Sequence, residues 1–161
     1  MVQSLESYLY IQRFRYANLA SYALDVEPQV RDYLVLNLVV QPVVENAVIH
    51  GMGGRAERGR IEVRAARDGE LLRFRISDDG AGMSADKLAI IRANMSSDSD
   101  GEASGLRNVH RRLQLFYGPQ YGVEIRSVEG RGTTVDIVMP IACPLPPARA
   151  PDTQAPPGAE I

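Results

Sequence analysis

Two acids and two glycines stand together in Asp78-Asp79-Gly80-Ala81-Gly82-Met83, directly after a segment with a strand pattern. In that segment Leu72, Phe74 and Ile76 alternate with arginines, which is the period of two typical of a half-buried strand. A carboxylate at the end of such a strand can accept a hydrogen bond from an amino group such as that of adenine. Glycines two residues apart allow a tight bend and let a flat ligand approach the backbone. The turn is therefore a candidate purine site.

A second candidate lies in the apolar stretch from Leu38 to His50, where Asn46 and His50 are four residues apart. On a helix this spacing puts both side chains on one face, and burying them without partners would cost a few kcal/mol. An asparagine carbonyl is a suitable ligand for Mg²⁺, which takes its other ligands from phosphates and water. The alternative is a helix end at which the two side chains meet solvent or cap a neighbour.

Glycines also precede two later elements. Ser104-Gly105-Leu106 opens a predicted helix, whose free N–H groups can bind phosphate, and Gly130-Arg131-Gly132-Thr133 precedes the final predicted strand. Taken alone, these are an ordinary glycine before a helix and an ordinary hairpin turn. Their order along the chain, after the amide-bearing helix and the acidic turn, is what favours a nucleotide site.

Two other nucleotide motifs fit poorly. Residues 80–85 match the loose dinucleotide fingerprint G-x-G-x-x-G/A, but a pyrophosphate there would face Asp78 and Asp79. The preceding strand also alternates with arginines, whereas parallel strands are apolar on both faces. Lys87 is the single lysine and follows an aspartate, so the chain has no Walker A loop.

Composition excludes several classes of protein. The 161 residues suffice for about one domain, and 18 basic against 20 acidic residues leave no global field for nucleic acid or anionic lipid. Cys143 is the only cysteine, so disulfides contribute nothing and a reducing compartment is expected. No apolar run reaches the roughly 18 residues typical of a membrane span. We therefore expect no nucleic-acid partner and no direct membrane contact from these residues.

Periodicity and turn residues predict the elements that hold these motifs. Helices are expected at 4–16, 34–50, 84–93 and 106–116, and strands at 19–26, 61–66, 71–77, 123–127 and 133–139. Asp68-Gly69 predicts a hairpin between the second and third strands. Residues 94–104 are predicted to be a mobile loop, and the proline-rich residues after Pro140 a disordered tail. This order predicts an α+β fold, a mixed and mostly antiparallel sheet covered on one face by helices.

Taken together, the motifs resemble the ATP-binding fold shared by DNA gyrase, Hsp90, histidine kinases and MutL proteins, a two-layer sandwich of the Bergerat type. Val43-Val44-Glu45-Asn46-Ala47 with His50-Gly51 resembles the N box, and the glycine turns resemble the glycine boxes. The segments Tyr8-Leu9-x-Ile11-Gln12, Gln41-Pro42-x-x-Glu45-Asn46-Ala47 and Gly105-Leu106-x-Asn108-Val109 are similar to LytS-like sensor histidine kinases. The resemblance covers about residues 4–140.

The resemblance implies a role for each motif. Asp78 would accept from the adenine amino group, directly and through a water near Thr133. Asn46 would bind Mg²⁺, and Asn46 and Glu45 would be the catalytic residues. Residues 94–104 would form a lid over ATP. The remaining residues expected to bind the nucleotide are His50, Gly80, Gly82, Met83, Gly105, Leu106, Arg107 and Gly132.

Three residues depart from the family pattern. Pro42 stands where ATP-hydrolysing relatives have a water-activating glutamate, so autonomous hydrolysis is not expected. Ile49 stands where many histidine kinases have a cation that touches phosphate, so Mg²⁺ or Arg107 would have to compensate. Ala103 replaces a glycine of the lid, which would stiffen its hinge.

The acceptor histidine of such kinases is also missing, because neither His50 nor His110 has the family's acceptor context. We therefore expect a cytoplasmic fragment of a longer receptor of the inner membrane. Residues 1–18 would connect it to a dimerisation segment, residues 19–140 would be the catalytic domain, and residues 141–161 the tail. The expected partners are that dimerisation and phosphoacceptor segment and a response regulator, and the full-length protein is expected to be a homodimer.

The sequence thus predicts the catalytic domain of a sensor histidine kinase, which uses ATP and Mg²⁺ to phosphorylate a histidine on a separate segment. Two alternatives remain open. One is a degenerate module that senses nucleotide or docks a partner without phosphotransfer. The other is a serine kinase of the anti-sigma-factor type, which shares the fold and needs no acceptor histidine.

Overall fold

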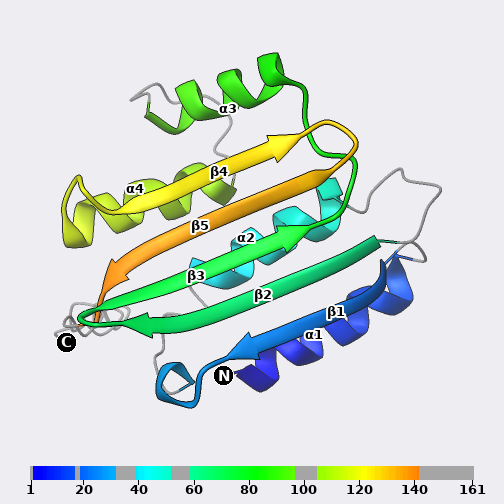
Figure 1. The fold of residues 1–161 in the computed structure, drawn as a ribbon, viewed down its shortest axis with the longest axis horizontal. Coiled ribbons are helices and arrows are strands. Elements are labelled where there is room, and N and C mark those ends of the chain that lie inside the picture. Colours follow the sequence, from blue (N-terminus) through cyan, green and yellow to red (C-terminus); the bar gives the residue numbers. More distant parts are fainter. Residues whose placement is uncertain (1, 17–18, 32–38, 52–58, 97–104, 142–161) are drawn as a thin grey trace, which may run out of the picture.

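Alternating strands and capped helices form the elements that the sequence predicts (Figure 1). The computed structural model describes residues 2–16, 19–31, 39–51, 59–96 and 105–141. Its elements in chain order are α1 (Val2–Arg15), β1 (Leu19–Val26), η1 (Pro28–Val30), α2 (Gln41–Asn46), η3 (Ala47–Gly51), β2 (Gly59–Asp68), β3 (Leu71–Asp78), α3 (Ala85–Ser96), α4 (Gly105–Tyr117), β4 (Gly122–Val128) and β5 (Gly132–Pro140).

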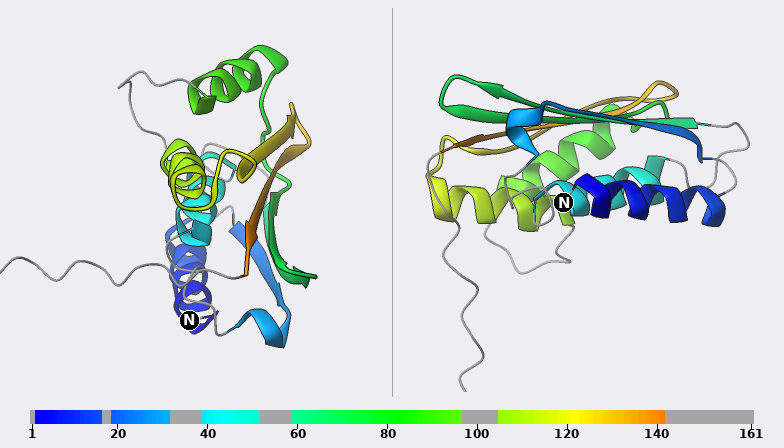
Figure 2. Two further views of the ribbon diagram at one scale, coloured as in Figure 1. Left: turned by 90° about the vertical axis from the view of Figure 1, so that its left-hand side faces the viewer. Right: turned by 90° about the horizontal axis from the view of Figure 1, so that it is seen from below.

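The strands form one five-stranded sheet in the order β1-β2-β3-β5-β4. Strands β1 and β2 pair in parallel, and all other pairs are antiparallel. The helices α1 to α4 lie on a single face of this sheet (Figure 2). The predicted mixed, mostly antiparallel sheet with one covered face is therefore confirmed.

Alternation along the strands decides which face the helices cover. The buried hydrophobic residues are Ile61, Val63 and Ala65 on β2 and Leu72, Phe74 and Ile76 on β3. The register places Val63 opposite Ile76, so the apolar side chains of neighbouring strands meet on the same face. One apolar face and one polar face are what a two-layer fold requires.

The hairpin between β2 and β3 differs by one residue from its prediction. Asp68 pairs with Leu71, so the turn residues are Gly69 and Glu70 rather than Asp68 and Gly69. Gly69 has φ +61°, and no residue other than glycine has a positive φ among the described residues. A two-residue turn with positive φ only at its first position is of type II′, which accounts for glycine there.

The apolar stretch predicted as one helix over 34–50 is divided. Helix α2 begins at Gln41 with Pro42 in its first turn, where proline's missing N–H costs nothing. It gives way to the π-helical turn η3 at Ala47. Three predicted segments lie outside the described residues: 32–38, the loop residues 97–104 and the tail residues 142–161. The remaining residues of the predicted loop, 94–96, belong to α3.

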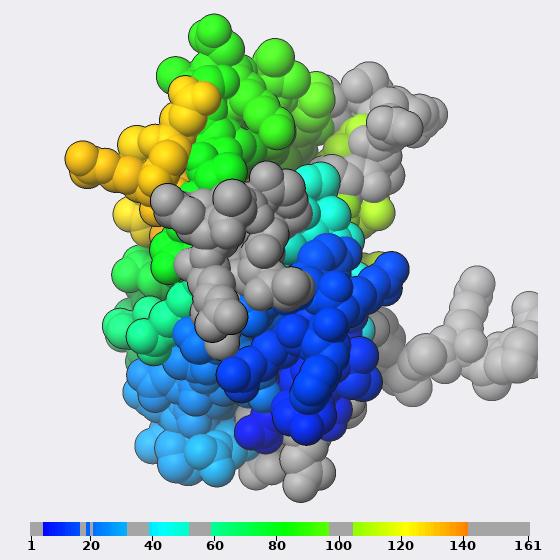
Figure 3. All heavy atoms as spheres, turned by 90° about the vertical axis from the view of Figure 1, so that its right-hand side faces the viewer, coloured from blue at the N-terminus to red at the C-terminus, as the bar shows by residue number. Residues whose placement is uncertain are grey.

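Strand β3 ends at the same end of the molecule as η3, the end that Figure 3 shows. In that view η3 (cyan) and the segment leading into α3 (green) both reach the surface. No helix among the described residues combines the length and apolar character needed to cross a bilayer.

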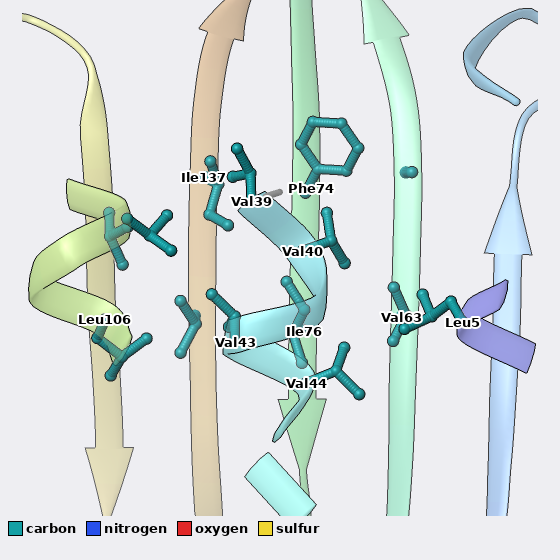
Figure 4. Packing of buried hydrophobic residues seen from close by; sticks show 14 of the residues in the cluster. Leu5, Val39, Val40, Val43, Val44, Val63, Phe74, Ile76, Leu106 and Ile137 are labelled. Atoms are coloured by element: carbon teal, nitrogen blue, oxygen red, sulfur yellow. The ribbon is translucent and has the colours of Figure 1, made fainter. Parts of the chain in front are cut away.

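The core forms where α2 crosses the middle of the sheet. Val40, Val43 and Val44 are buried in the same hydrophobic cluster as Phe74 and Ile76 (Figure 4). Each buried aliphatic side chain contributes about 1.5–3 kcal/mol relative to exposure. The apolar part of α2 thus fixes the position of the polar residues that follow it.

Ion pairs, not helices, cover the other face of the sheet. Arg75 Nε donates to Asp136 Oδ1 at 2.6 Å, and Arg126 donates to the other oxygen of that carboxylate. Burial opposes ionisation of Asp136, but the hydrogen bonds and charges of Arg75 and Arg126 outweigh it, so the pKa of Asp136 lies below its ordinary value. This carboxylate joins β3, β5 and β4 across the open face.

We expect Asp136→Asn to lower the free energy of unfolding by about 1 kcal/mol at pH 7 because both pairs lose their charge. The folded pKa is depressed, so the contribution is fully present above the unfolded value of about 3.9 and is lost as pH falls below it. Urea unfolding from pH 7 to pH 2.5 should therefore show the two proteins converging in acid.

Asp68→Asn is the matched control. Its pair with Arg73 has the same 2.6 Å separation, but the side chain is 61% exposed against 15% for Asp136. A loss at Asp68 as large as that at Asp136, or a difference for Asp136→Asn that persists in acid, would contradict the assignment.

Candidate functional site

The site is built around the carboxylate of Asp78, the last residue of β3. It follows Phe74 and Ile76 on the face toward the helices and is only 9% exposed. Its Oδ1 accepts a hydrogen bond of 2.9 Å from the Gly80 N–H. A buried carboxylate needs such donors, because an unpaired charge away from water is costly.

Close backbone packing explains two of the glycines around this carboxylate. A Cβ on Gly51, at the end of η3, would lie 2.7 Å from Asp78 Cγ. A Cβ on Gly80 would lie 2.2 Å from the Gly51 carbonyl oxygen. Both distances are too short for any side chain, so η3 and the turn after β3 meet directly beside the acid. Gly80 therefore packs behind Asp78, whereas the sequence predicted it in contact with the ligand.

A cavity opens beside Asp78, with a volume of about 780 Å³ including its open mouth. The space open to the centre of a water molecule is about 160 Å³, and the larger volume includes open solvent. The sheet contributes Ile76, Asp78, Ile125, Thr133 and Val135 to its lining. The helical segments α2 and η3 contribute Val43, Asn46, Ala47, His50 and Gly51.

The rest of the lining comes from the segment after β3 and from the two later helices. It consists of Gly82, Met83, Lys87, Ile91 and, from α4, Leu106. Most of the lining side chains are apolar, and a few polar groups converge among them. A slot of this kind suits a flat, largely apolar heterocycle held by a few hydrogen bonds.

Asn46 and His50 open onto this cavity, as their spacing predicted. Asn46 is half-buried at the end of α2, and His50 is exposed within the π-helical turn. π-helical turns are rare and are often found at functional sites. The amide oxygen of Asn46 is a suitable ligand for a hard cation. Asp78 and Asn46, which lie far apart in the sequence, thus line one cavity.

Thr133 lies beside Asp78 at the other edge of β3. The two residues are paired in the register of β3 and β5, and Thr133 Oγ1 is 2.9 Å from Ser127 Oγ. A hydroxyl at this position can share a water or a ligand amino group with the carboxylate.

The predicted site residues fall into two groups. Seven of them line the cavity: Asn46, His50, Asp78, Gly82, Met83, Leu106 and Thr133. The other five are outside its lining: Glu45, Gly80, Gly105, Arg107 and Gly132. Two glycines of the second group pack closely against residues near the site. A Cβ on Gly132 would lie 2.0 Å from the Asp78 carbonyl oxygen, and one on Gly105 would lie 3.7 Å from the Pro42 carbonyl oxygen.

Glu45 faces away from the cavity toward α1. It accepts a hydrogen bond of 3.0 Å from Gln41 Nε2. Burial and, second, the charge of Glu45 raise the pKa of Tyr8 on α1 to about 12. Arg107 is 5% exposed and takes part in an interaction of its own. Neither residue reaches the ligand space in this conformation.

Sequence reasoning missed Lys87 and the aliphatic lining. The sequence predicts Ile91, Ile125 and Val135 only as apolar members of a helix and two strands. It uses Lys87 only as evidence against a Walker A loop. One signal was available, because Lys87 and Ile91 are four residues apart on α3 and share a face.

Comparisons with known proteins agree with the site's motifs. A family model described as "Histidine kinase-, DNA gyrase B-, and HSP90-like ATPase" matches residues 31–142. The sensor protein LytS of Staphylococcus haemolyticus is 34% identical over 140 residues, which cover 86% of this chain and 24% of LytS. The sensor histidine kinase YpdA of Escherichia coli is 29% identical over 136 residues, covering 84% of this chain and 23% of YpdA. The chain thus spans about a quarter of the length of these relatives.

Solved structures support the fold. The histidine kinase domain of the Erythrobacter litoralis EL346 blue-light activated kinase has a TM-score of 0.57 and 23% identity, over 85% of this chain and 59% of that domain. The mycobacterial sensor histidine kinase MprB has a TM-score of 0.56 and 20% identity, over 87% of this chain and 95% of that structure. The LytS-like resemblance seen in the sequence is confirmed. On this evidence the chain belongs to the family of histidine kinase-, DNA gyrase B- and HSP90-like ATPases.

Proposed function

We propose that this chain binds Mg·ATP in the cavity beside Asp78 and transfers the γ-phosphoryl group to a histidine on a separate dimerisation segment. The observation that carries the proposal is that Asp78 and Asn46, from two different motifs of the set, line the same cavity. A response regulator would then receive the phosphoryl group. The full-length protein would be a homodimeric receptor of the inner membrane with this domain in the cytoplasm.

Asp78 is suited to read the purine. Its Oδ1 is engaged by the Gly80 N–H, and a carboxylate has further lone pairs to accept from an exocyclic amino group. Ile76, Ile125 and Val135 provide apolar contact for the ring faces. A purine with a carbonyl instead of the amino group would meet the carboxylate with an acceptor, so adenine is favoured over guanine.

Asn46 is suited to hold magnesium together with the phosphates. No cluster of three or more histidine, cysteine, aspartate or glutamate side chains that would hold a metal by itself occurs within the described ranges. An ion with one amide ligand and several phosphate and water oxygens is consistent with such a site. When bound, Mg²⁺ would neutralise charge on the phosphates.

The beginning of α4 would receive the phosphate chain. Leu106 lines the cavity, and Gly105 precedes it at the N-terminus of a 13-residue helix. Unpaired N–H groups in the first turn of a helix favour anions. Pro42, which stands where hydrolysing relatives have glutamate, lies near Gly105 and has no group to activate water. Transfer to a partner is therefore proposed rather than hydrolysis.

Glu45 would act on the acceptor histidine as it approaches, in line with its proposed catalytic role. Its carboxylate accepts a hydrogen bond from Gln41 on the same helix, and its charge helps to raise the pKa of Tyr8 on α1. Labelling with γ-labelled ATP in the presence of a phosphoacceptor segment tests transfer directly. An acid-labile label on the segment supports a histidine kinase, and an acid-stable label on a partner supports a serine kinase.

A nucleotide-sensing module without phosphotransfer is the second candidate function. It is favoured by Ile49, which is apolar, 50% exposed and outside the cavity lining, where many kinases have a phosphate-binding cation. Binding of ATP with no label on any supplied acceptor would select this candidate.

We expect Asp78→Asn to weaken ATP binding about 100-fold, because the amide's NH₂ would meet the adenine amino group in place of an acceptor. Titration calorimetry with Mg·ATP measures this loss, and thermal unfolding checks that the variant is folded. Asp79→Asn is the matched control, since that exposed carboxylate accepts from the Arg60 N–H at 2.6 Å outside the cavity. Unchanged ATP affinity in Asp78→Asn would rule out the adenine assignment.

We expect Asn46→Ala to weaken ATP binding about tenfold in the presence of Mg²⁺ and to leave binding in EDTA unchanged, because the lost oxygen serves only the metal. The measurement is a pair of ATP titrations, with and without the ion. Asn94→Ala, an exposed asparagine at the end of α3, is the control. An equal loss with and without Mg²⁺ would show that Asn46 does not act through magnesium.

A further inference from the structure

We propose that Lys87 binds the phosphate chain of the nucleotide and supplies, from α3, the cation that position 49 lacks. This inference rests on the proposed binding of Mg·ATP. Lys87 is the single lysine of the chain. Neither the Asp78–Met83 turn before it nor the composition of the chain indicates this role.

The cap of α3 fixes where Lys87 lies. Ser84 precedes the helix, and its Oγ accepts a hydrogen bond of 3.4 Å from the Lys87 N–H. Its carbonyl accepts from the Leu88 N–H at 3.0 Å. These bonds set Lys87 in the first turn, one turn before Ile91 on the same face. Both side chains line the cavity, together with Met83 ahead of the cap.

Lys87 is also uncommitted. Among the residues that the structure describes, its ammonium makes no hydrogen bond and no ion pair. Of the described lining residues it alone carries a permanent positive charge. Asp78, the only acid in the lining, is 9% exposed and bonded to the Gly80 N–H. A free ammonium group in a lining whose other described residues carry no permanent positive charge favours an anionic ligand.

The other candidates for this charge are placed elsewhere. Ile49 has no charge to offer and points outside the cavity lining at 50% exposure. Arg107 is buried to 5% exposure and already has an interaction, and it is absent from the lining although Leu106 beside it is present. The sequence left this compensation to Mg²⁺ or Arg107, and Lys87 is better placed than Arg107 to provide it.

A lysine side chain suits this position because it combines an apolar stem with a charged end. Its four-carbon stem can lie along the apolar wall beside Met83 and Ile91 while the ammonium group stays in water. The ammonium is a mobile point charge with three donors, so it can follow a phosphate chain without a fixed geometry. In the proposed complex the purine lies at Asp78 and the metal at Asn46. The phosphates are then the anionic part of the ligand that is left for the ammonium group of Lys87.

The test compares Lys87→Met with the parent by calorimetry against ATP, ADP and adenosine. We expect binding of ATP and ADP to weaken about tenfold and binding of adenosine to stay the same, because only the phosphates use the charge. Lys87→Arg should restore most of the affinity. Arg13→Met is the matched control, since it removes the same charge from the exposed side of α1, far from the lining.

A second measurement uses the fact that the chain has one lysine. An acyl phosphate of ATP transfers its acyl group to an amine near the phosphates: the amine nitrogen forms an amide, the acyl–oxygen bond breaks, ATP leaves and one proton is released. Peptide mass spectrometry should find the label on Lys87, and excess ATP should prevent it.

The outcomes separate this inference from the proposed function. A parent protein that binds no Mg·ATP would overturn both. If the parent binds ATP while Lys87→Met binds it equally well, or while Lys87 takes up no label that ATP suppresses, only the role of Lys87 is overturned. An equal loss for adenosine and ATP would likewise overturn it, because the stem would then be packing on the purine.

Discussion

A carboxylate held almost out of water is the constraint on which the other parts of this structure depend. The carboxyl group of Asp78 is buried next to an apolar core, so it must be given hydrogen-bond donors. The Gly80 N–H supplies one donor, and the glycine backbone of η3 fills the adjoining space. The end of β3, the end of η3 and the beginning of β5 are thereby fixed around one acid. The ligand cavity is the remaining open side of that arrangement.

The layer arrangement explains why the site lies at one end of the sheet. The inner face is filled by α2, whose valines pack on Phe74 and Ile76. The outer face is closed by arginine–acid pairs such as Arg75 with Asp136, which satisfy one another across the strands. Charged groups that are already paired have little to offer a ligand. The polar side chains that line the cavity, such as Asp78 and Thr133, therefore lie at the strand ends, where helices and turns approach but do not fill the space.

Local patterns predicted most of the fold and part of the site. Alternation and capping are properties of neighbouring residues, so the hairpin, the helices and the mixed sheet followed from the sequence, with the turn displaced by one residue to Gly69 and Glu70. The shared cavity of Asp78 and Asn46 followed only from the resemblance to a family. The positions of Gly80, Glu45 and Lys87 relative to the cavity followed from neither, because they depend on how η3 and α3 lie against the sheet. Spacing alone cannot supply that information.

The close approach of Gly51 to Asp78 has a mechanical consequence. Backbone in direct contact with a buried side chain leaves little room for sliding, so we expect η3 and the end of β3 to move together. Helix α3 is attached differently, since Arg92 reaches across to the Ile125 carbonyl oxygen with bonds of 2.6 and 3.2 Å at the end of a long side chain. The two sides of the cavity are thus held together differently. We expect any opening of the cavity to occur on the α3 side, while the Asp78 side keeps its shape.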